Sequence, residues 1–199
     1  MEERSRRIVE TAIELAEKGG FEAVRLRDVA ADAQVALGTL YRRFRSKEDL
    51  LVAALEFEVE NLEQAFSARP PTGSSELERV MGFFELAVRG LLRRRNLARA
   101  LLKAVSSGDP ELTQRMAAHH AHIERMIVMA VRGEVTRNGK GGLLDPDPGT
   151  REGRVAETLN HVWYALLMGW AGGVHGQATM LEKMRVSAEM VLRGSSPGL

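Results

Sequence analysis

The chain has 199 residues, of which 44% are hydrophobic and 28% are charged, a composition typical of a folded globular protein and not of a disordered one. The formal net charge is only +1 at pH 7, so any affinity for nucleic acid must come from local clusters of charge. Cysteine is absent, which excludes disulfide scaffolds and thiolate metal sites.

The sequence shows neither an export signal nor a membrane span. The N-terminal residues are charged, whereas a secretory signal needs an apolar run there. The longest apolar stretch, residues 162–174, is too short and too rich in glycine to cross a bilayer. The lack of cysteine fits a reducing compartment. These features favour a cytoplasmic protein with no membrane partner.

Hydrophobic residues recur with helical periodicity, and no segment alternates convincingly as a strand. The first predicted helix covers about residues 4–18, and Gly19–Gly20 is expected to end it. Short helices are predicted at about residues 27–33 and 37–44. A longer helix follows Ser46, which stands three residues before an acidic residue as in a capping box.

The remainder of the chain is also predicted to be helical, which makes the fold class all-α. Residues 67–75 and 138–150 are predicted loops because they are rich in Gly, Pro and small polar residues. The tail from Gly194 is expected to be frayed. Further helices are predicted over about residues 76–94, 96–106, 110–137, 151–171 and 178–193.

Residues 24–51 predict a helix-turn-helix, because two short helices are separated by a tight turn at residues 33–36. In such a motif the second helix enters the major groove by its N-terminal end, where small residues allow close approach. The side chains expected to pack inward between the two helices are Val29, Ala30, Leu40 and Phe44.

The outer face of the second short helix is basic. Residues 37–47 contain four bases and no acid. The hydroxyl groups of Thr39 and Tyr41 can bind phosphate oxygens, as can a lysine at the start of the next helix. The same pattern also fits two ordinary packed helices with a solvated basic face, and pattern alone leaves both interpretations open. The bases are Arg42, Arg43, Arg45 and Lys47.

Residues 35–51, Val-Ala-Leu-Gly-Thr-Leu-Tyr-Arg-Arg-Phe-Arg-Ser-Lys-Glu-Asp-Leu-Leu, resemble the signature of the tetracycline-repressor (TetR) family. Ile8, Ala12, Gly20–Phe21 and Val29–Ala30 also stand where that family has its pattern. The resemblance is strong over roughly the first quarter of the chain. It implies an all-α homodimer that represses transcription, has no enzymatic activity and needs no cofactor.

On this resemblance, residues 1–46 form the helix-turn-helix domain. Residues 47–199 form the helical effector-binding and dimerisation domain, with 47–66 as the connecting helix. We expect the dimer to bind a near-palindromic operator in double-stranded DNA and to leave it when a small apolar or amphipathic effector binds. Activation instead of repression stays open. The residues expected at the DNA are Arg27, Ala36, Leu37, Gly38, Thr39, Tyr41, Arg42, Arg45 and Lys47.

Two positions depart from the family pattern. The family usually has Gly where Gln34 stands and a capping Ser or Thr where Ala36 stands. Loss of the cap should cost the second helix of the motif about 1 kcal/mol, and neither change removes a DNA-contacting group. Ala36, with residues 19–24 upstream, also resembles a steroid-catabolism branch of the family.

The C-terminal region is rich in Met, Leu and Trp, which suits an apolar ligand. In the family, the last two helices form a four-helix dimer interface, although a purely intramolecular core would show the same pattern. The expected effector-pocket residues are Phe83, Phe84, Met116, Met126, Trp163 and Trp170. The expected interface residues are Leu159, Val162, Leu166, Leu181, Met184 and Ala188.

Residues 86–108 contain six bases and no acid. The ordinary interpretation is a solvated bend in the helices. Alternatively, the bases bind an anionic effector such as an acyl-CoA, including a steroid-derived one, or lie near DNA and add to its attraction. The bases are Arg89, Arg93, Arg94, Arg95, Arg99 and Lys103.

Three histidines, His119, His120 and His122, cluster with Glu124 on one predicted helix. A metal site needs three or four convergent ligands, so surface or pocket histidines are the favoured interpretation and no metal is predicted. Two rival functions fit an all-helical chain: an enzyme, and an interaction module without DNA affinity. No glycine-rich phosphate loop, nucleophile elbow or paired metal-ligand motif supports the enzyme.

Overall fold

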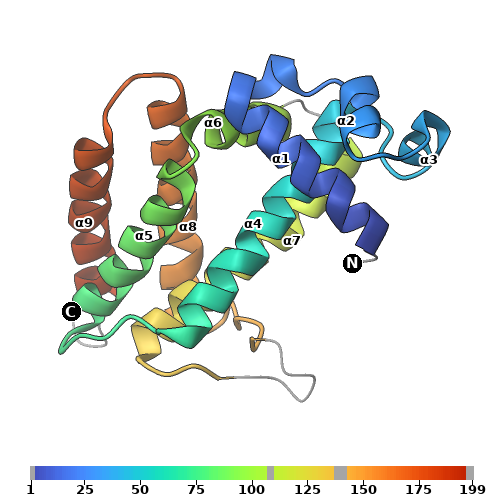
Figure 1. Cartoon of the computed structure of the whole chain (residues 1–199). Coiled ribbons are helices and arrows are strands. Elements are labelled where there is room, and N and C mark those ends of the chain that lie inside the picture. The colour runs from blue at the N-terminus through green and yellow to red at the C-terminus, as the bar shows by residue number, and fades with distance from the viewer. Residues whose placement is uncertain (1–2, 107–109, 137–142, 196–199) are drawn as a thin grey trace. The chain divides into compact units, whose positions relative to one another are not determined.

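A computed structural model describes residues 3–106, 110–136 and 143–195 (Figure 1). Over these residues the chain forms helices and no strand, which confirms the predicted all-α class. The helices are α1 (Glu3–Ala23), α2 (Leu26–Asp32), α3 (Leu37–Tyr41), α4 (Lys47–Ala68), α5 (Glu76–Leu92), α6 (Arg95–Val105), α7 (Pro110–Arg132), α8 (Arg151–Ala171) and α9 (Gln177–Gly194).

The chain folds into two compact units. The first unit is made of residues 1–60 and 91–117, and the second of residues 61–90 and 118–199. Each unit therefore combines segments that are distant in sequence. The predicted DNA-binding domain, residues 1–46, lies wholly within the first unit. A functional boundary after residue 46 stays a prediction.

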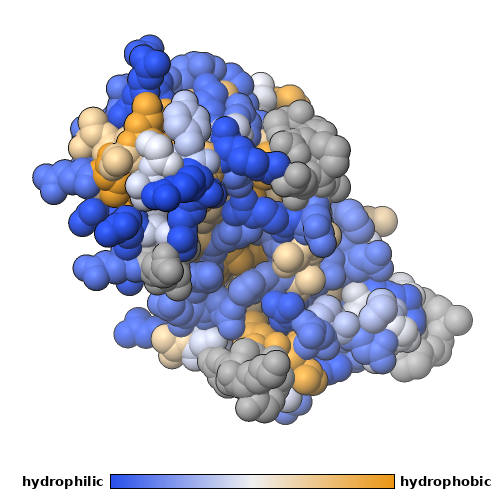
Figure 2. Space-filling model, turned by 90° about the vertical axis from the view of Figure 1, so that its right-hand side faces the viewer, coloured by the Kyte–Doolittle hydropathy of each residue, from blue (hydrophilic) through white to orange (hydrophobic). Residues whose placement is uncertain are grey.

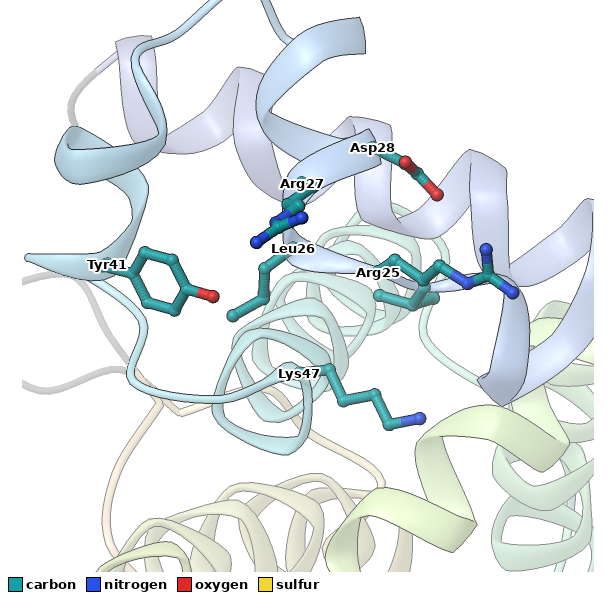
Figure 3. Close-up of a pocket in the computed structure, with 7 residues that line it drawn as sticks. Arg25, Leu26, Arg27, Asp28, Tyr41 and Lys47 are labelled. Carbon is teal, nitrogen blue, oxygen red and sulfur yellow. The ribbon is translucent and has the colours of Figure 1, made fainter.

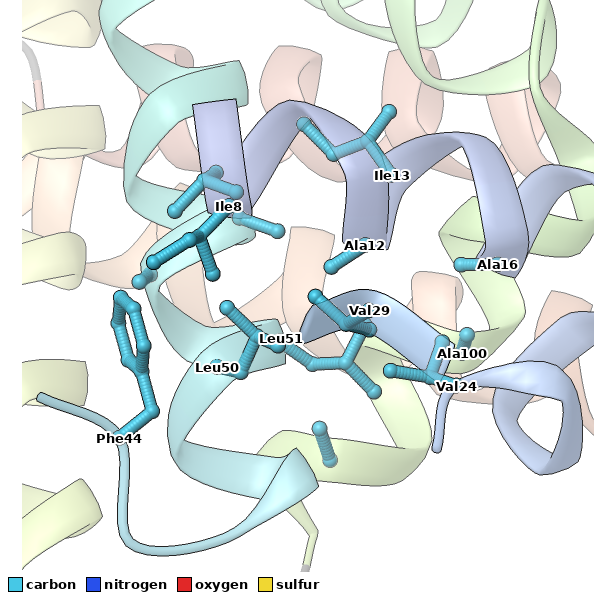
Figure 4. Close-up of a cluster of buried hydrophobic side chains, with 14 of the residues drawn as sticks. Ile8, Ala12, Ile13, Ala16, Val24, Val29, Phe44, Leu50, Leu51 and Ala100 are labelled. Atoms are coloured by element: carbon cyan, nitrogen blue, oxygen red, sulfur yellow. The ribbon is translucent and has the colours of Figure 1, made fainter. Parts of the chain in front are cut away.

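The core of the first unit joins α1, α2, α3, α6 and the beginning of α4 (Figure 4). Ala12 and Ala16 on α1 are fully buried, as is Ala100 on α6. Such small side chains let two helix backbones approach closely, and α1 and α6 contact each other extensively. The helix-turn-helix is thus packed together with α6. Larger side chains in this core include Ile8, Ile13, Val24, Val29, Leu40, Phe44, Leu50, Leu51 and Leu101.

The predicted break at Gly19–Gly20 is present, but one more helical turn follows it. Both glycines have non-helical backbone angles, and Gly20 has φ +68°. This left-handed conformation is one that L side chains rarely adopt. The break redirects the chain, and residues 21–23 then form the last turn of α1 before α2 begins.

The predicted end of α7 at residue 137 was wrong, because α7 ends at Arg132. Gly133 follows with φ +78°, a conformation that commonly terminates helices. The guanidinium of Arg79 donates to the carbonyl oxygens of Ala130 (3.0 Å) and Val131 (2.7 Å). These carbonyls have no partner inside the helix, so a distant arginine caps it. Arg137 itself lies outside the described residues, as does part of the predicted loop 138–150.

The core of the second unit is aromatic. Phe66, Phe83, Phe84 and Trp163 form a chain of ring contacts with centroid separations of 5.9, 5.0 and 5.4 Å. Helices α8 and α9 run antiparallel and contact each other along their length (Figure 1). None of the described helices combines the length and apolarity needed to cross a lipid bilayer.

Candidate functional site

Helix α2 ends in a tight turn in which one residue has a left-handed backbone conformation. The amide of Val35 donates to the carbonyl of Ala30 (2.9 Å), and the amide of Gln34 donates to that of Ala31 (3.1 Å). This pair of bonds defines the Schellman motif, whose residue after the cap is usually glycine. Gln34 occupies that position with φ +53°, the only positive φ at a non-glycine among the described residues. The usual glycine at this position of the motif is explained by the positive φ, which glycine adopts without steric cost.

The inner faces of the two short helices pack as predicted. Val29, Ala30, Leu40 and Phe44 are all at most 7% exposed. Burial of each large side chain stabilises the fold by roughly 1.5–3 kcal/mol. The tight packing fixes the angle between α2 and α3, so the outer face of α3 is presented by a rigid support.

The first residues of α3 form an open, uncapped surface. Ala36 is the residue before the helix and makes no side-chain capping bond, as its sequence predicts. Gly38 is exposed, and a Cβ added there would meet no atom of the described residues within 4 Å. Farther along, Tyr41 is 50% exposed. Arg42 donates to the Thr39 hydroxyl over 3.1 Å.

Predicted DNA contacts from three helices converge on one open recess (Figure 3). Arg27 comes from the start of α2, Tyr41 from the end of α3 and Lys47 from the start of α4. Figure 3 shows the Tyr41 hydroxyl pointing toward Leu26 and Arg27. The recess thus collects three cationic groups, the Tyr41 phenol and one carboxylate, that of Asp28. The cations outnumber the acid, so the set is able to bind a phosphate oxygen.

The predicted cap of α4 is confirmed, and it has a partner that the local pattern did not show. The Ser46 hydroxyl accepts the amide of Asp49 over 3.1 Å. The Asp49 carboxylate accepts the amide of Arg45 (3.0 Å) and also a bond from Arg115 on α7 (2.5 Å). Arg115 further pairs with Glu56 at 2.6 Å. This partly buried network joins the end of the helix-turn-helix to α7 within the first unit.

Lys47 is engaged inside the chain. Its ammonium lies 3.3 Å from the carboxylate of Glu22 and 3.9 Å from the centre of the Phe21 ring. Lys103 on α6 binds the same carboxylate at 2.8 Å and lies 4.5 Å from the same ring. These hydrogen bonds and charges, first from Lys103 and then from Lys47, lower the pKa of Glu22. Glu22 therefore carries its negative charge next to a predicted phosphate contact.

The nine predicted DNA-contacting residues all belong to the first unit and all reach its surface. Leu37, Thr39 and Lys47 are partly exposed, and the other six are exposed. Figure 2 views the side on which α3 lies in Figure 1, and most of that face is hydrophilic. The exposure of the nine residues permits contact with DNA, and that contact stays a prediction.

The predicted effector-pocket residues do not share one unit. Met116 belongs to the first unit, and the other five belong to the second. Phe83, Phe84 and Met126 are fully buried, whereas Trp163 and Trp170 are each 6% exposed. These aromatic side chains are core residues of the second unit, so they could line only an internal cavity.

The predicted interface residues fall into two groups. Leu159, Met184 and Ala188 are fully buried within the single chain, so a partner subunit cannot cover them further. Val162, Leu166 and Leu181 remain partly exposed. Helix α9 also exposes two large apolar side chains that the pattern did not single out, Val186 (53%) and Met190 (70%).

The basic cluster of residues 86–108 is less isolated than its sequence suggested. Arg94 pairs with Glu58 at 3.4 Å, and Lys103 pairs with Glu22 at 2.8 Å. Arg89 lies in the second unit, while the other five bases lie in the first. The absence of acids within the segment is therefore offset by acids brought in from α1 and α4.

The histidines of α7 have separate surroundings. Burial lowers the pKa of His119 to about 4, with smaller contributions from His120 and His122. His122 contacts the carboxylate of Glu63. Asn160 of α8 is buried and donates to Glu124 over 3.0 Å. Among the described residues, no group of three or more His, Asp or Glu side chains is placed to hold a metal ion.

Comparisons with known proteins agree with this geometry. Residues 8–54 match the family described as bacterial regulatory proteins, tetR family. The chain is 29% identical to the transcriptional repressor KstR of Rhodococcus jostii RHA1, over 98% of this chain and 85% of that protein. It is 30% identical to KstR of Mycobacterium tuberculosis, over 84% of this chain and 71% of that protein.

Solved structures show the same fold. A TetR transcriptional regulator from Rhodococcus sp. RHA1 superposes with a TM-score of 0.76 at 25% identity, over 96% of this chain and 97% of that one. The repressor FadR of Thermus thermophilus, solved in complex with lauroyl-CoA, superposes with a TM-score of 0.67 at 20% identity, over 98% of both chains.

Proposed function

The chain belongs to the TetR family of bacterial regulatory proteins, and we infer that it acts as a ligand-responsive transcriptional repressor that presents α3 to operator DNA. The observation that carries this proposal is Gly38. It lies at the start of α3, is exposed, has no positive φ and leaves open space where a Cβ would stand. No neighbour among the described residues requires glycine there.

Glycine inside a helix is unfavourable by roughly 1 kcal/mol relative to alanine. An external surface explains its presence, because a missing side chain lets the helix backbone approach a base pair closely. Around this point of approach, Tyr41, Arg27 and Lys47 bind phosphates, while Thr39 and Arg42 face base edges. Phosphate contacts position the protein, and contacts with base edges give sequence specificity.

The repressor works as a homodimer on a near-palindromic site. Two α3 helices must lie about 34–36 Å apart to use successive major grooves. Apolar side chains of α8 and α9 that are not buried supply the contact between subunits: the partly exposed Val162, Leu166 and Leu181, and the exposed Val186 and Met190. The buried residues Leu159, Met184 and Ala188 support this face from behind.

The effector binds in the second unit and is apolar or amphipathic. The core there is rich in aromatic and methionine side chains, and buried Asn160 pairs there with Glu124. An apolar cavity with a few polar groups is typical of small-molecule sites. Acyl-CoA thioesters are the first candidates, since lauroyl-CoA is bound by a protein of this fold. The effector acts by binding the DNA-free conformation more tightly than the DNA-bound one.

The DNA proposal is tested with Gly38→Ala. Operators are first selected from genomic fragments with the purified wild-type protein. We expect Gly38→Ala to raise the melting temperature slightly and to weaken operator binding at least tenfold. Gly90→Ala on α5 is the matched control, because Gly90 is also exposed, helical and without neighbours within 4 Å. It should stabilise the fold without affecting DNA. Equal operator binding by both variants would contradict the placement of α3 at the DNA.

The effector proposal is tested by titrating the protein–operator complex with a fatty or steroid acyl-CoA, the matching free acid and free CoA. Release by the thioester alone would show that the effector needs both an apolar body and an anionic head. Equal release by an uncharged hydrophobe would assign recognition to the apolar body. No release by any compound would exclude this effector class.

The rival function is a helical interaction module without DNA affinity. A repressor that neutralises several phosphates loses affinity steeply as salt rises, with a slope of roughly −0.9 per phosphate in a plot of log K against log salt. A flat salt dependence, or no fragment enrichment in the genomic selection, would favour the interaction module.

A further inference from the structure

Glu22 binds two lysines that come from different parts of the first unit. Lys47 stands at the start of α4 and lines the recess of Figure 3, whereas Lys103 stands near the end of α6. Their ammonium groups lie 3.3 and 2.8 Å from the two carboxylate oxygens of Glu22. One carboxylate therefore bridges α6 and the proposed DNA-binding surface.

Phe21 strengthens this arrangement. Both ammonium groups lie over its ring, at 3.9 and 4.5 Å from the ring centre. A ring face attracts each cation, but two cations over one ring repel each other. The negative charge of Glu22 offsets that repulsion. The left-handed Gly20 immediately before Phe21 sets the chain direction that places both residues there.

The three side chains of this cluster differ in how far they are exposed to solvent. The Glu22 side chain is 74% exposed, Lys103 is 58% exposed and Lys47 is 27% exposed. Exposed ion pairs contribute little to folding stability, so this cluster is not needed to hold α1 in place. Its geometry matters instead for binding, because a DNA phosphate at the recess must compete with Glu22 for Lys47.

We propose that Glu22 is a shared counter-ion whose division between Lys103 and Lys47 sets how strongly Lys47 binds DNA phosphate. This inference rests on the proposed DNA-binding function. While Lys103 shares the carboxylate, Glu22 holds Lys47 less tightly, and phosphate can displace it from Lys47. When Lys103 is lost or withdrawn, the carboxylate turns wholly to Lys47 and competes with DNA. The position of the Lys103 side chain thereby affects phosphate binding by Lys47, through Glu22.

The test is a double-mutant cycle measured by fluorescence anisotropy with operator DNA at about 0.15 M salt, where exposed charges farther apart than about 8 Å are largely screened. Glu22→Gln keeps the size of the side chain, and Lys103→Met keeps its apolar stem over Phe21. We expect Glu22→Gln to bind operator about three- to tenfold more tightly, since it removes a competitor and a charge that repels phosphate. Lys103→Met should bind about two- to threefold more weakly.

The decisive quantity is the effect of Lys103→Met in the Glu22→Gln background. It should vanish, because without the carboxylate Lys103 has nothing to divert from Lys47. Glu14→Gln and Lys18→Met are matched controls, since they remove the same charges from exposed positions on α1, and both should leave affinity nearly unchanged.

Three outcomes would overturn the proposal while leaving DNA binding itself intact. Glu22→Gln could bind no more tightly than wild type. Lys103→Met could weaken binding equally in both backgrounds, which would show that Lys103 acts on DNA directly. The control variants could reproduce the same changes, which would reduce the effect to net charge. Failure of the wild-type protein to bind any selected fragment would instead refute the proposed function.

Discussion

The left-handed conformation of Gln34 leads to a substitution that should stabilise the protein. In Gln34→Gly, the new residue adopts φ +53° without the contact between Cβ and the following carbonyl, which costs other residues roughly 1–2 kcal/mol. Glycine also loses more entropy on folding, roughly 0.4–1 kcal/mol. Because Gln34 is exposed, no buried side-chain contact is lost. The midpoints of the two ranges leave a net gain of about 0.8 kcal/mol.

Thermal unfolding followed by circular dichroism measures this gain. For a chain of this length, 1 kcal/mol shifts the midpoint by about 2–4 °C, so Gln34→Gly should raise it by about 1–4 °C. Gln34→Ala is the first control, because alanine has the same backbone restriction, and it should give no gain. Gln64→Gly is the second, because Gln64 is exposed within α4, where glycine should destabilise by about 0.7–1 kcal/mol.

The two glycine substitutions should thus act with opposite signs. A destabilising effect of Gln34→Gly, or an equal gain from Gln34→Ala, would refute the left-handed turn. Operator affinity provides a further readout. Gln34 lies in the turn before α3 and not on the outer face of α3. The substitution Gln34→Gly should therefore leave operator affinity within about twofold of wild type.

Three further predictions concern other parts of the chain. Arg115→Met should destabilise the first unit by about 1–3 kcal/mol in denaturant titrations, because Asp49 and Glu56 lose their cation in a site only partly open to water; a change below about 0.3 kcal/mol would contradict the network. Since the pKa of His119 falls from 6.5 to about 4 on folding, protonation favours the unfolded chain, so stability should fall by at most about 3 kcal/mol as pH drops from 6.5 to 4. His119→Phe should remove that part of the loss, and identical pH profiles would show that other groups cause it. Met190→Lys should weaken the dimer in analytical ultracentrifugation without changing the helical signal, whereas Leu144→Lys, at an exposed apolar residue outside α8 and α9, should leave the dimer intact.

Features that depend on neighbouring residues could be predicted from the sequence. The bounds of α2 and α8, the cap at Ser46 and the break at Gly19–Gly20 all depend on interactions within a few residues. The inward face of the helix-turn-helix was predictable for the same reason, since helical spacing alone places Leu40 and Phe44 on one side.

Features that depend on distant residues could not be predicted. The end of α7 depends on Arg79, which lies 51 and 52 residues before the carbonyls it binds. The α4 cap gains Arg115 from 66 residues away. Hydrophobic periodicity shows which face of a helix is buried, but it does not show which polar side chain from another helix will reach that helix's end.

In the basic segment 86–108, contacts with distant residues also change a functional interpretation. Within the segment no acid is present, and an anion site was one reasonable interpretation. The fold instead brings Glu58 to Arg94 and Glu22 to Lys103. Glu22 is 81 residues from Lys103 but only 25 from Lys47, and no local pattern connects the three. Because α1 packs on α6 through small buried residues such as Ala16 and Ala100, an acid just beyond the glycine break of α1 reaches both lysines. In the proposed DNA complex, the charge next to Lys47 is therefore set by the packing of α1 against α6, and changing Glu22 and Lys103 singly and together tests this link.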